Sequence, residues 1–89
     1  MVEGKTKSGF KFKVNEKIFS DWDFVTLSDK LRRGEGTMQD ANVLYEMILG
    51  SDGMKKLKEH IRKKNDGIVD ALAMKEEFTE IVASTKAKN

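Results

Sequence analysis

The hydrophobic pattern of residues 8–27 decides the fold, and this stretch reads SGFKFKVNEKIFSDWDFVTL. Its first part alternates Phe10, Phe12 and Val14 with lysines, which is the two-residue period of a half-buried strand. Behind Ser20 the apolar residues crowd at helical spacing and include the only tryptophan. The stretch also holds four of the five phenylalanines of the chain. It therefore predicts a strand that leads directly into an aromatic-rich helix, at a junction that seeds the core.

The residues before this strand predict a hairpin. Residues 1–9 contain a weak first strand, Val2–Lys7, and a two-residue turn, Ser8-Gly9, in which glycine supplies a positive φ. A two-stranded hairpin is only marginally stable alone. We therefore expect it to pack against helices.

The remainder of the chain predicts about four short helices, over residues 21–33, 38–49, 51–64 and 69–84. Ser20 with Asp23, and Thr37 with Asp40, have the spacing of capping boxes at the first two helix starts. Gly50 separates the second helix from the third. The expected fold is α+β, mostly α, in one domain spanning residues 1–89, with a structured core over residues 10–84 and a frayed tail over residues 85–89.

Composition excludes several classes of protein. The 89 residues carry 36% charged side chains, well above the roughly 25% of average domains, so most helix faces must be solvated. The chain lacks cysteine, which excludes disulfides, thiolate metal sites and a cysteine nucleophile. It also lacks the run of about 20 apolar residues that a membrane span requires. We expect an intracellular protein with no membrane partner.

Catalytic, metal-binding and cofactor-binding residues are not predicted. His60 is the only histidine, and we interpret it as an ordinary surface residue. Glu76 and Glu77 are interpreted as part of a solvated helix face, and Asp21 and Asp23 as helix caps. No set of residues supplies a nucleophile, a base and an orienting group together.

A basic run is the main electrostatic feature, and its members are Lys55, Lys56, Lys58, Arg62, Lys63 and Lys64. Without interleaved aromatic residues, a solvated helix explains the run better than nucleic-acid binding does. An acidic protein partner is a third interpretation. If an anionic partner binds, we expect Lys55, Lys56, Arg62 and Lys63 to contact it.

Large adaptable side chains predict a second kind of surface. The aromatic and methionine side chains that interfaces enrich are here Trp22, Tyr45, Met38, Met47, Met54 and Met74, and among them we single out Trp22, Tyr45 and Met47. A domain of this size cannot bury all its helix faces, so we expect an exposed apolar patch formed by some of these residues.

Three stretches together resemble the small tail assembly chaperones of long-tailed phages and prophages of Gram-positive bacteria. They are FKFKVNEKIFSDWDFVTLSDKL, LYEMILGSDGMKKLKEHIRKKNDGIV and ALAMKEEFTEIVAS, at residues 10–31, 44–69 and 71–84. The likeness lies in their order and spacing, and it covers nearly the whole chain. Two features differ from the family pattern, namely the net positive charge and Val69, where proline often opens the last helix.

The resemblance implies a non-enzymatic role without a cofactor. Members of that family bind the long tape-measure protein during tail growth, help to recruit tail-tube subunits and are absent from the finished virion. It thus implies action in the cytoplasm of the bacterial host. In this interpretation Trp22, Tyr45 and Met47 contribute to the tape-measure-binding surface, and incompletely covered amphipathic helices favour homo-oligomers.

Two other functions remain open from the residues alone. A small basic nucleic-acid-binding accessory protein would depend on the lysines of residues 55–64, and it would bind with a steep salt dependence. A structural protein of the tail or of the head–tail joint would form stable rings and remain in purified virions.

Overall fold

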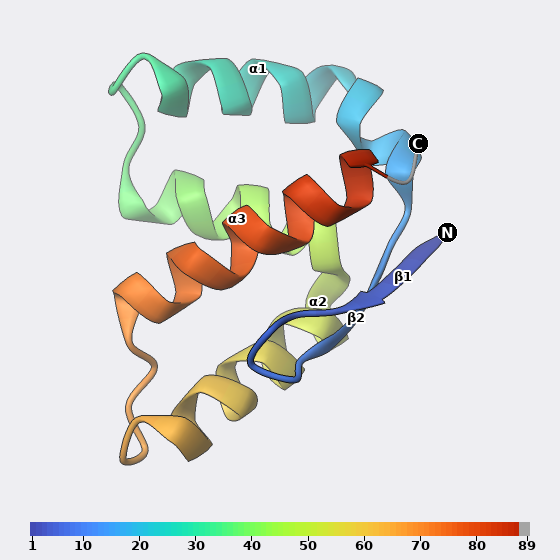
Figure 1. Cartoon of the computed structure of the whole chain (residues 1–89). Helices are drawn as coiled ribbons and strands as arrows, with labels where there is room; N and C mark the ends of the chain where they lie inside the picture. Colours follow the sequence, from blue (N-terminus) through green and yellow to red (C-terminus); the bar gives the residue numbers. More distant parts are fainter. Residues whose placement is uncertain (88–89) are drawn as a thin grey trace.

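A computed structural model describes residues 1–87 of the chain (Figure 1). Its elements are β1 (Val2–Lys5), β2 (Lys11–Val14), the 3-10 helix η1 (Glu16–Ser20), α1 (Trp22–Arg32), α2 (Met38–Lys64) and α3 (Ala71–Ala87). The chain is α+β and mostly α, as predicted. Residues 1–87 form three α-helices rather than about four, because the helices predicted over residues 38–49 and 51–64 join across a kink in α2.

The hairpin follows the predicted alternation. β1 and β2 pair antiparallel, with Val2 opposite Val14. The side chains of Phe10, Phe12 and Val14 are buried, whereas those of the intervening lysines are exposed. The hairpin packs against helices as expected, since β2 contacts α2 and β1 contacts α3. Binary patterning alone therefore identified the buried face of this sheet.

The turn of the hairpin is longer than predicted. β1 ends at Lys5, and the N–H groups of Thr6 and Gly9 donate to the carbonyls of Phe10 and Thr6, each at 2.9 Å. These bonds enclose a three-residue connection, residues 7–9, instead of the two-residue Ser8-Gly9 turn. Gly9 has φ +98°, so the expected positive φ falls on the last residue of this connection.

The start of α1 differs from the prediction by one residue. Asp21, not Ser20, is the N-cap, and its carboxylate accepts from the Phe24 N–H at 3.0 Å. Ser20 belongs to η1, where its hydroxyl donates to the carbonyl of Lys17 at 3.0 Å. This turn of 3-10 helix occupies the serine and leaves the following aspartate to cap α1.

The glycine between the second and third predicted helices forms a kink. Thr37 and Asp40 form the predicted capping box at the start of α2. Within the helix, Gly50 has φ +78° and ψ +168°, a conformation that only glycine adopts readily. The backbone at Gly50 is not helical, so the predicted break is present, and two helical segments meet at a kink within α2 (Figure 1).

The last helix is shifted toward the C-terminus relative to the prediction. Asp70 accepts from the Ala73 N–H at 2.9 Å, and α3 begins at Ala71 rather than at Val69. The expected frayed tail is wrong over its first residues, because α3 continues through Ala87 and Thr85 is fully buried. The Thr85 hydroxyl donates to the Ile81 carbonyl at 2.8 Å, which allows this polar side chain to lie inside. Residues 88–89 lie outside the described part of the chain.

The core lies where the hairpin meets the three helices. α3 runs across α2 between α1 and the hairpin (Figure 1), and it contacts both α2 and β1. The buried apolar residues that form the core cluster are Phe10, Phe12, Val14, Phe24, Ile48, Met54, Leu57, Ile61, Met74, Phe78 and Ile81. Every described element except β1 and η1 contributes to this cluster, and the predicted strand and helix supply Phe10, Phe12, Val14 and Phe24 to it.

Candidate functional site

The predicted docking residues lie in different environments. Trp22, the first residue of α1, is 82% exposed. Tyr45 is half-buried, and its ring stacks on Phe78 with centroids 3.8 Å apart and planes 11° apart. Met47 is half-buried and packs against the core cluster. The side chain of Trp22 is therefore free to contact a partner, whereas Tyr45 and Met47 also belong to the fold.

An apolar groove of about 470 Å³ lies between α2 and the start of α3, and most of its α2 lining comes from the first half of that helix. Its apolar lining consists of Met38, Ala41, Tyr45, Val69, Leu72 and Met74. Met38 and Leu72 are 73% and 63% exposed, so its two rims present large apolar side chains to the solvent. Tyr45 forms part of its wall, but Trp22 and Met47 are not among its lining residues.

The remaining rim of the apolar groove is polar and basic. Asn42, Lys58 and Lys75 complete the lining together with Ala71. An apolar floor with a charged rim is the surface that receives one face of an amphipathic helix. Sequence reasoning missed Val69 and Leu72, because Leu72 lies beside the inward-facing stripe of α3 and no local pattern marks its exposure.

The lysines of the second half of α2 gather with a lysine of the hairpin. Lys55, Lys56 and Lys63 line a hollow of about 490 Å³ to which β2 contributes Lys11. Arg62 is not a lining residue, and its guanidinium pairs with Glu59 along the helix. Three of the four predicted anionic-partner contacts therefore converge, and the structure adds Lys11, which lies more than 40 residues away in the sequence.

A polar cluster, formed by Thr6, Ser8, His60 and Glu77, joins the hairpin turn to α2 and α3, and the side chains of Thr6 and Glu77 are buried. Glu77 Oε1 accepts from the hydroxyls of Thr6 and Ser8, at 2.8 and 3.0 Å. Ser8 Oγ lies 2.9 Å from His60 Nε2. The interpretation of Glu77 as solvated is wrong, since this side chain is buried against partners that only the tertiary fold supplies.

His60 also departs from the expectation of an ordinary surface residue. Its ring is half-buried, with its centroid 5.6 Å from that of Phe10. The Ser8 hydroxyl lies between the two groups, with its oxygen 3.0 Å from Glu77 Oε1 and 2.9 Å from His60 Nε2. This order differs from a Ser–His–acid relay, in which the carboxylate contacts the imidazole and orients it. The cluster fastens the hairpin turn to two helices.

Further contacts hold the same turn. The backbone N–H of Lys7 donates to Glu80 Oε1 at 2.7 Å, and Lys64 Nζ donates to the carbonyl of Ser8.

Within residues 1–87, no three His, Cys, Asp or Glu side chains are grouped as metal ligands. Across the same residues, no helix combines the length and apolar character needed to cross a membrane.

Comparisons of the chain with protein-family models, curated proteins and solved structures give no match.

Proposed function

We propose that this chain is a non-catalytic tail assembly chaperone that binds an amphipathic helix of a tape-measure protein in the apolar groove. The observation that carries the proposal is the pair of exposed rim residues, Met38 and Leu72, on either side of an apolar floor. In this proposal the client is a long helix that exposes apolar stripes while the tail grows. A groove of this kind covers one such stripe and keeps the client soluble.

The chemistry of the groove suits a variable client sequence. Methionine side chains are unbranched and flexible, so Met38 and Met74 adapt to different apolar residues. Tyr45 provides a rigid wall, because its ring is stacked on Phe78. This combination of a fixed wall and adaptable rims favours successive contacts along a long, repetitive helix.

Trp22 and Val25 offer a second apolar contact on α1 in this proposal. They lie one helical turn apart, and their side chains are 82% and 49% exposed. In the proposed function this patch either extends the tape-measure contact or receives a tail-tube subunit. The protein acts in the bacterial cytoplasm before the virion is complete.

Co-expression with the tape-measure protein of the same genome tests this function. We expect the tape-measure protein to become soluble and to remain bound at high salt, because apolar contacts are not screened by ions. Failure to solubilise or retain the client would contradict the proposal. Retention that disappears at high salt would instead assign the binding to the lysines.

A nucleic-acid-binding function is the second candidate, and the convergence of Lys11, Lys55, Lys56 and Lys63 favours it. Phosphate groups would neutralise these lysines. However, Phe10 in this hollow is only 6% exposed and offers no free face for base stacking, and the ring of His60 is half-buried. This geometry gives less support to nucleic acid than the apolar groove gives to a helical client.

A further inference from the structure

The outer edge of β2 has backbone groups that no strand satisfies. The Thr6 N–H donates to the Phe10 carbonyl, which sets Thr6 and Phe10 as a hydrogen-bonded pair of the antiparallel ladder. Hydrogen-bonded pairs alternate with non-hydrogen-bonded pairs along an antiparallel ladder. The backbone N–H and C=O groups of Phe12 and Val14 therefore also point toward β1. The N–H and C=O groups of Lys11 and Lys13 consequently point away from β1.

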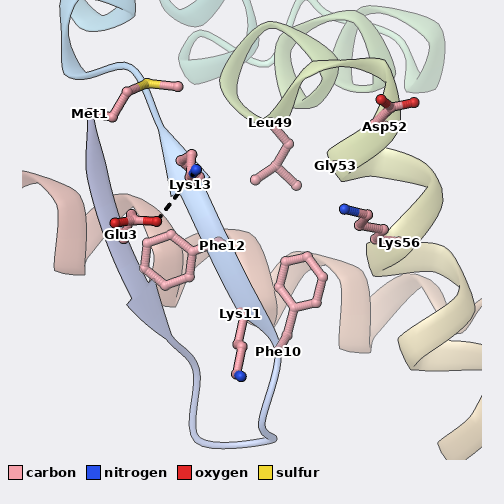
Figure 2. A pocket seen from close by; sticks show the side chains of 10 residues that line it. All are labelled: Met1, Glu3, Phe10, Lys11, Phe12, Lys13, Leu49, Asp52, Gly53 and Lys56. Carbon is pink, nitrogen blue, oxygen red and sulfur yellow. Dashed lines mark ion pairs between the residues drawn. The ribbon is translucent and has the colours of Figure 1, made fainter.

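A groove follows this edge. Within residues 1–87 the sheet consists of β1 and β2 alone, so the outer edge of β2 is unpaired. Beside it lies a hollow of about 540 Å³, lined by residues 10–13 on the strand side (Figure 2). Leu49, Asp52, Gly53 and Lys56 of α2 line the opposite side. The kink at Gly50 lies next to this wall.

The basic hollow continues the same groove. Both hollows are lined by Phe10, Lys11 and Lys56, and the second extends to His60 and Lys63. We call the two together the edge groove. It runs along β2 and the second half of α2, and it therefore offers room for a short extended segment.

The edge groove has an excess of unpaired positive charge. Within residues 1–87, four lysines of the groove form no ion pair, namely Lys11, Lys55, Lys56 and Lys63. Two of the acids that line it are already paired, Glu3 with Lys13 at 3.5 Å and Glu59 with Arg62. Asp52 is the other acidic lining residue. Carboxylates of a partner would complement this charge.

We propose that an extended, acidic segment of a partner protein binds in the edge groove as a third strand on β2. Its backbone would hydrogen-bond to the outward-facing groups of Lys11 and Lys13. Acidic side chains on one face of the added strand would lie beside those two lysines. Apolar side chains on its other face would point toward Leu49 and the floor of the groove. This site is separate from the apolar groove and does not depend on the proposed function.

The charges of β2 decide among the possible occupants. A second copy of the chain pairing through β2 would bring Lys11 and Lys13 against the same lysines, a like-charge arrangement that protects edges from self-association. Nucleic acid would neutralise the lysines but would not match the alternating donors and acceptors of a strand edge. An acidic peptide satisfies both the charge and the backbone groups.

A peptide titration with residue-resolved hydrogen exchange tests the proposal. The probe is a seven-residue peptide of alternating glutamate and valine with blocked ends. Saturation should slow exchange of the Lys11 and Lys13 amides by about tenfold or more. The Phe12 amide, which already faces β1, should change little. Lys11→Glu should weaken binding by about tenfold, whereas Lys17→Glu, the same charge change outside the groove, should weaken it far less.

Control ligands separate strand addition from charge attraction. A peptide with N-methyl groups on the edge-facing amides keeps its charge and should bind at least about tenfold more weakly. Equal binding of the methylated peptide, or unchanged exchange at Lys11 and Lys13, would overturn the proposal. The proposal would also be overturned if the peptide did not bind at millimolar concentration, or if an oligothymidine bound more tightly than the peptide. Protection of the Lys11 and Lys13 amides by self-association of the chain, without any peptide, would overturn it too.

Discussion

The ring of Tyr45 stacks on the ring of Phe78 with 3.8 Å between centroids, and this contact joins α2 to α3 beside the apolar groove. One face of the tyrosine therefore belongs to the core, and the residue also lines the groove. The stack keeps the wall of the groove rigid while the rim side chains of Met38 and Leu72 remain free.

Removing this stack should lower the stability of the fold. We expect Tyr45→Ala to lower the free energy of unfolding by about 2 kcal/mol, because it removes a half-buried aromatic ring and leaves Phe78 without its partner. Tyr45→Phe keeps the stacked ring and serves as the matched control. Urea denaturation measures the difference, and equal stability of the alanine and phenylalanine variants would contradict the assigned role.

The buried Glu77 should contribute more to stability than its exposed neighbour. Glu77→Ala leaves the buried Thr6 hydroxyl without its acceptor, and we expect a loss of about 2 kcal/mol. Glu76→Ala changes an exposed residue on the same helix, so its effect should stay within about 0.5 kcal/mol. Similar denaturation midpoints for the two variants would show that the polar cluster does not fasten the hairpin.

Gly50 should tolerate no other residue without cost. Its φ of +78° with ψ of +168° is strained for any side chain, so Gly50→Ala should destabilise the fold by about 1–3 kcal/mol. Ser51→Ala, at the exposed neighbouring position, is the control. Thermal unfolding followed by circular dichroism compares them. An unchanged midpoint for Gly50→Ala would mean that α2 is not kinked in this way.

Acid should weaken the start of α2. The Thr37 N–H donates to the Asp40 carboxylate and Lys30 pairs with it, and together they hold the pKa of Asp40 below its ordinary value of 3.8. When a carboxylate has a lower pKa in the folded state than in the unfolded state, it stabilises the fold at pH values above its pKa in the unfolded state. This stabilisation is lost as the pH falls through the pKa in the folded state. Between about pH 5 and pH 2, the wild-type urea midpoint should therefore fall more than that of Asp40→Asn. Parallel pH profiles would contradict this role for Asp40.

Local patterns predicted the features of the fold that depend on near neighbours. The alternation over residues 10–14 identified the buried face of β2, and Thr37 with Asp40 identified the start of α2. The glycine at position 50 marked a real change in backbone direction. The prediction that Ser20 caps α1 was wrong because an additional turn of 3-10 helix, capped by Asn15, precedes α1.

Local sequence patterns could not predict the features that depend on residues far apart in the sequence. Glu77 and Thr6 are 71 residues apart, and Ser8 and His60 are 52 apart, so nothing near either partner indicates their contact. For the same reason, local patterns could not predict that Lys11 of β2 lies beside the lysines of α2. The exposed rim of the apolar groove depends on how α3 crosses α2, a geometry that helix periodicity does not contain.

The most direct test of the central claim is the affinity of the tape-measure protein for variants of the apolar groove, measured at high salt. Leu72→Asp adds a charge to the groove near the start of α3, where the helix dipole favours an acid and the fold should survive. Val43→Asp makes a comparable change at an exposed valine of α2 that does not line the groove. Circular dichroism establishes that both variants are folded.

The account predicts that Leu72→Asp weakens tape-measure binding by about tenfold or more, while Val43→Asp binds within about twofold of wild type. Trp22→Ala, measured alongside, shows whether the patch on α1 contributes to the same contact. Wild-type affinity of a folded Leu72→Asp variant would contradict the claim that the apolar groove receives the client helix.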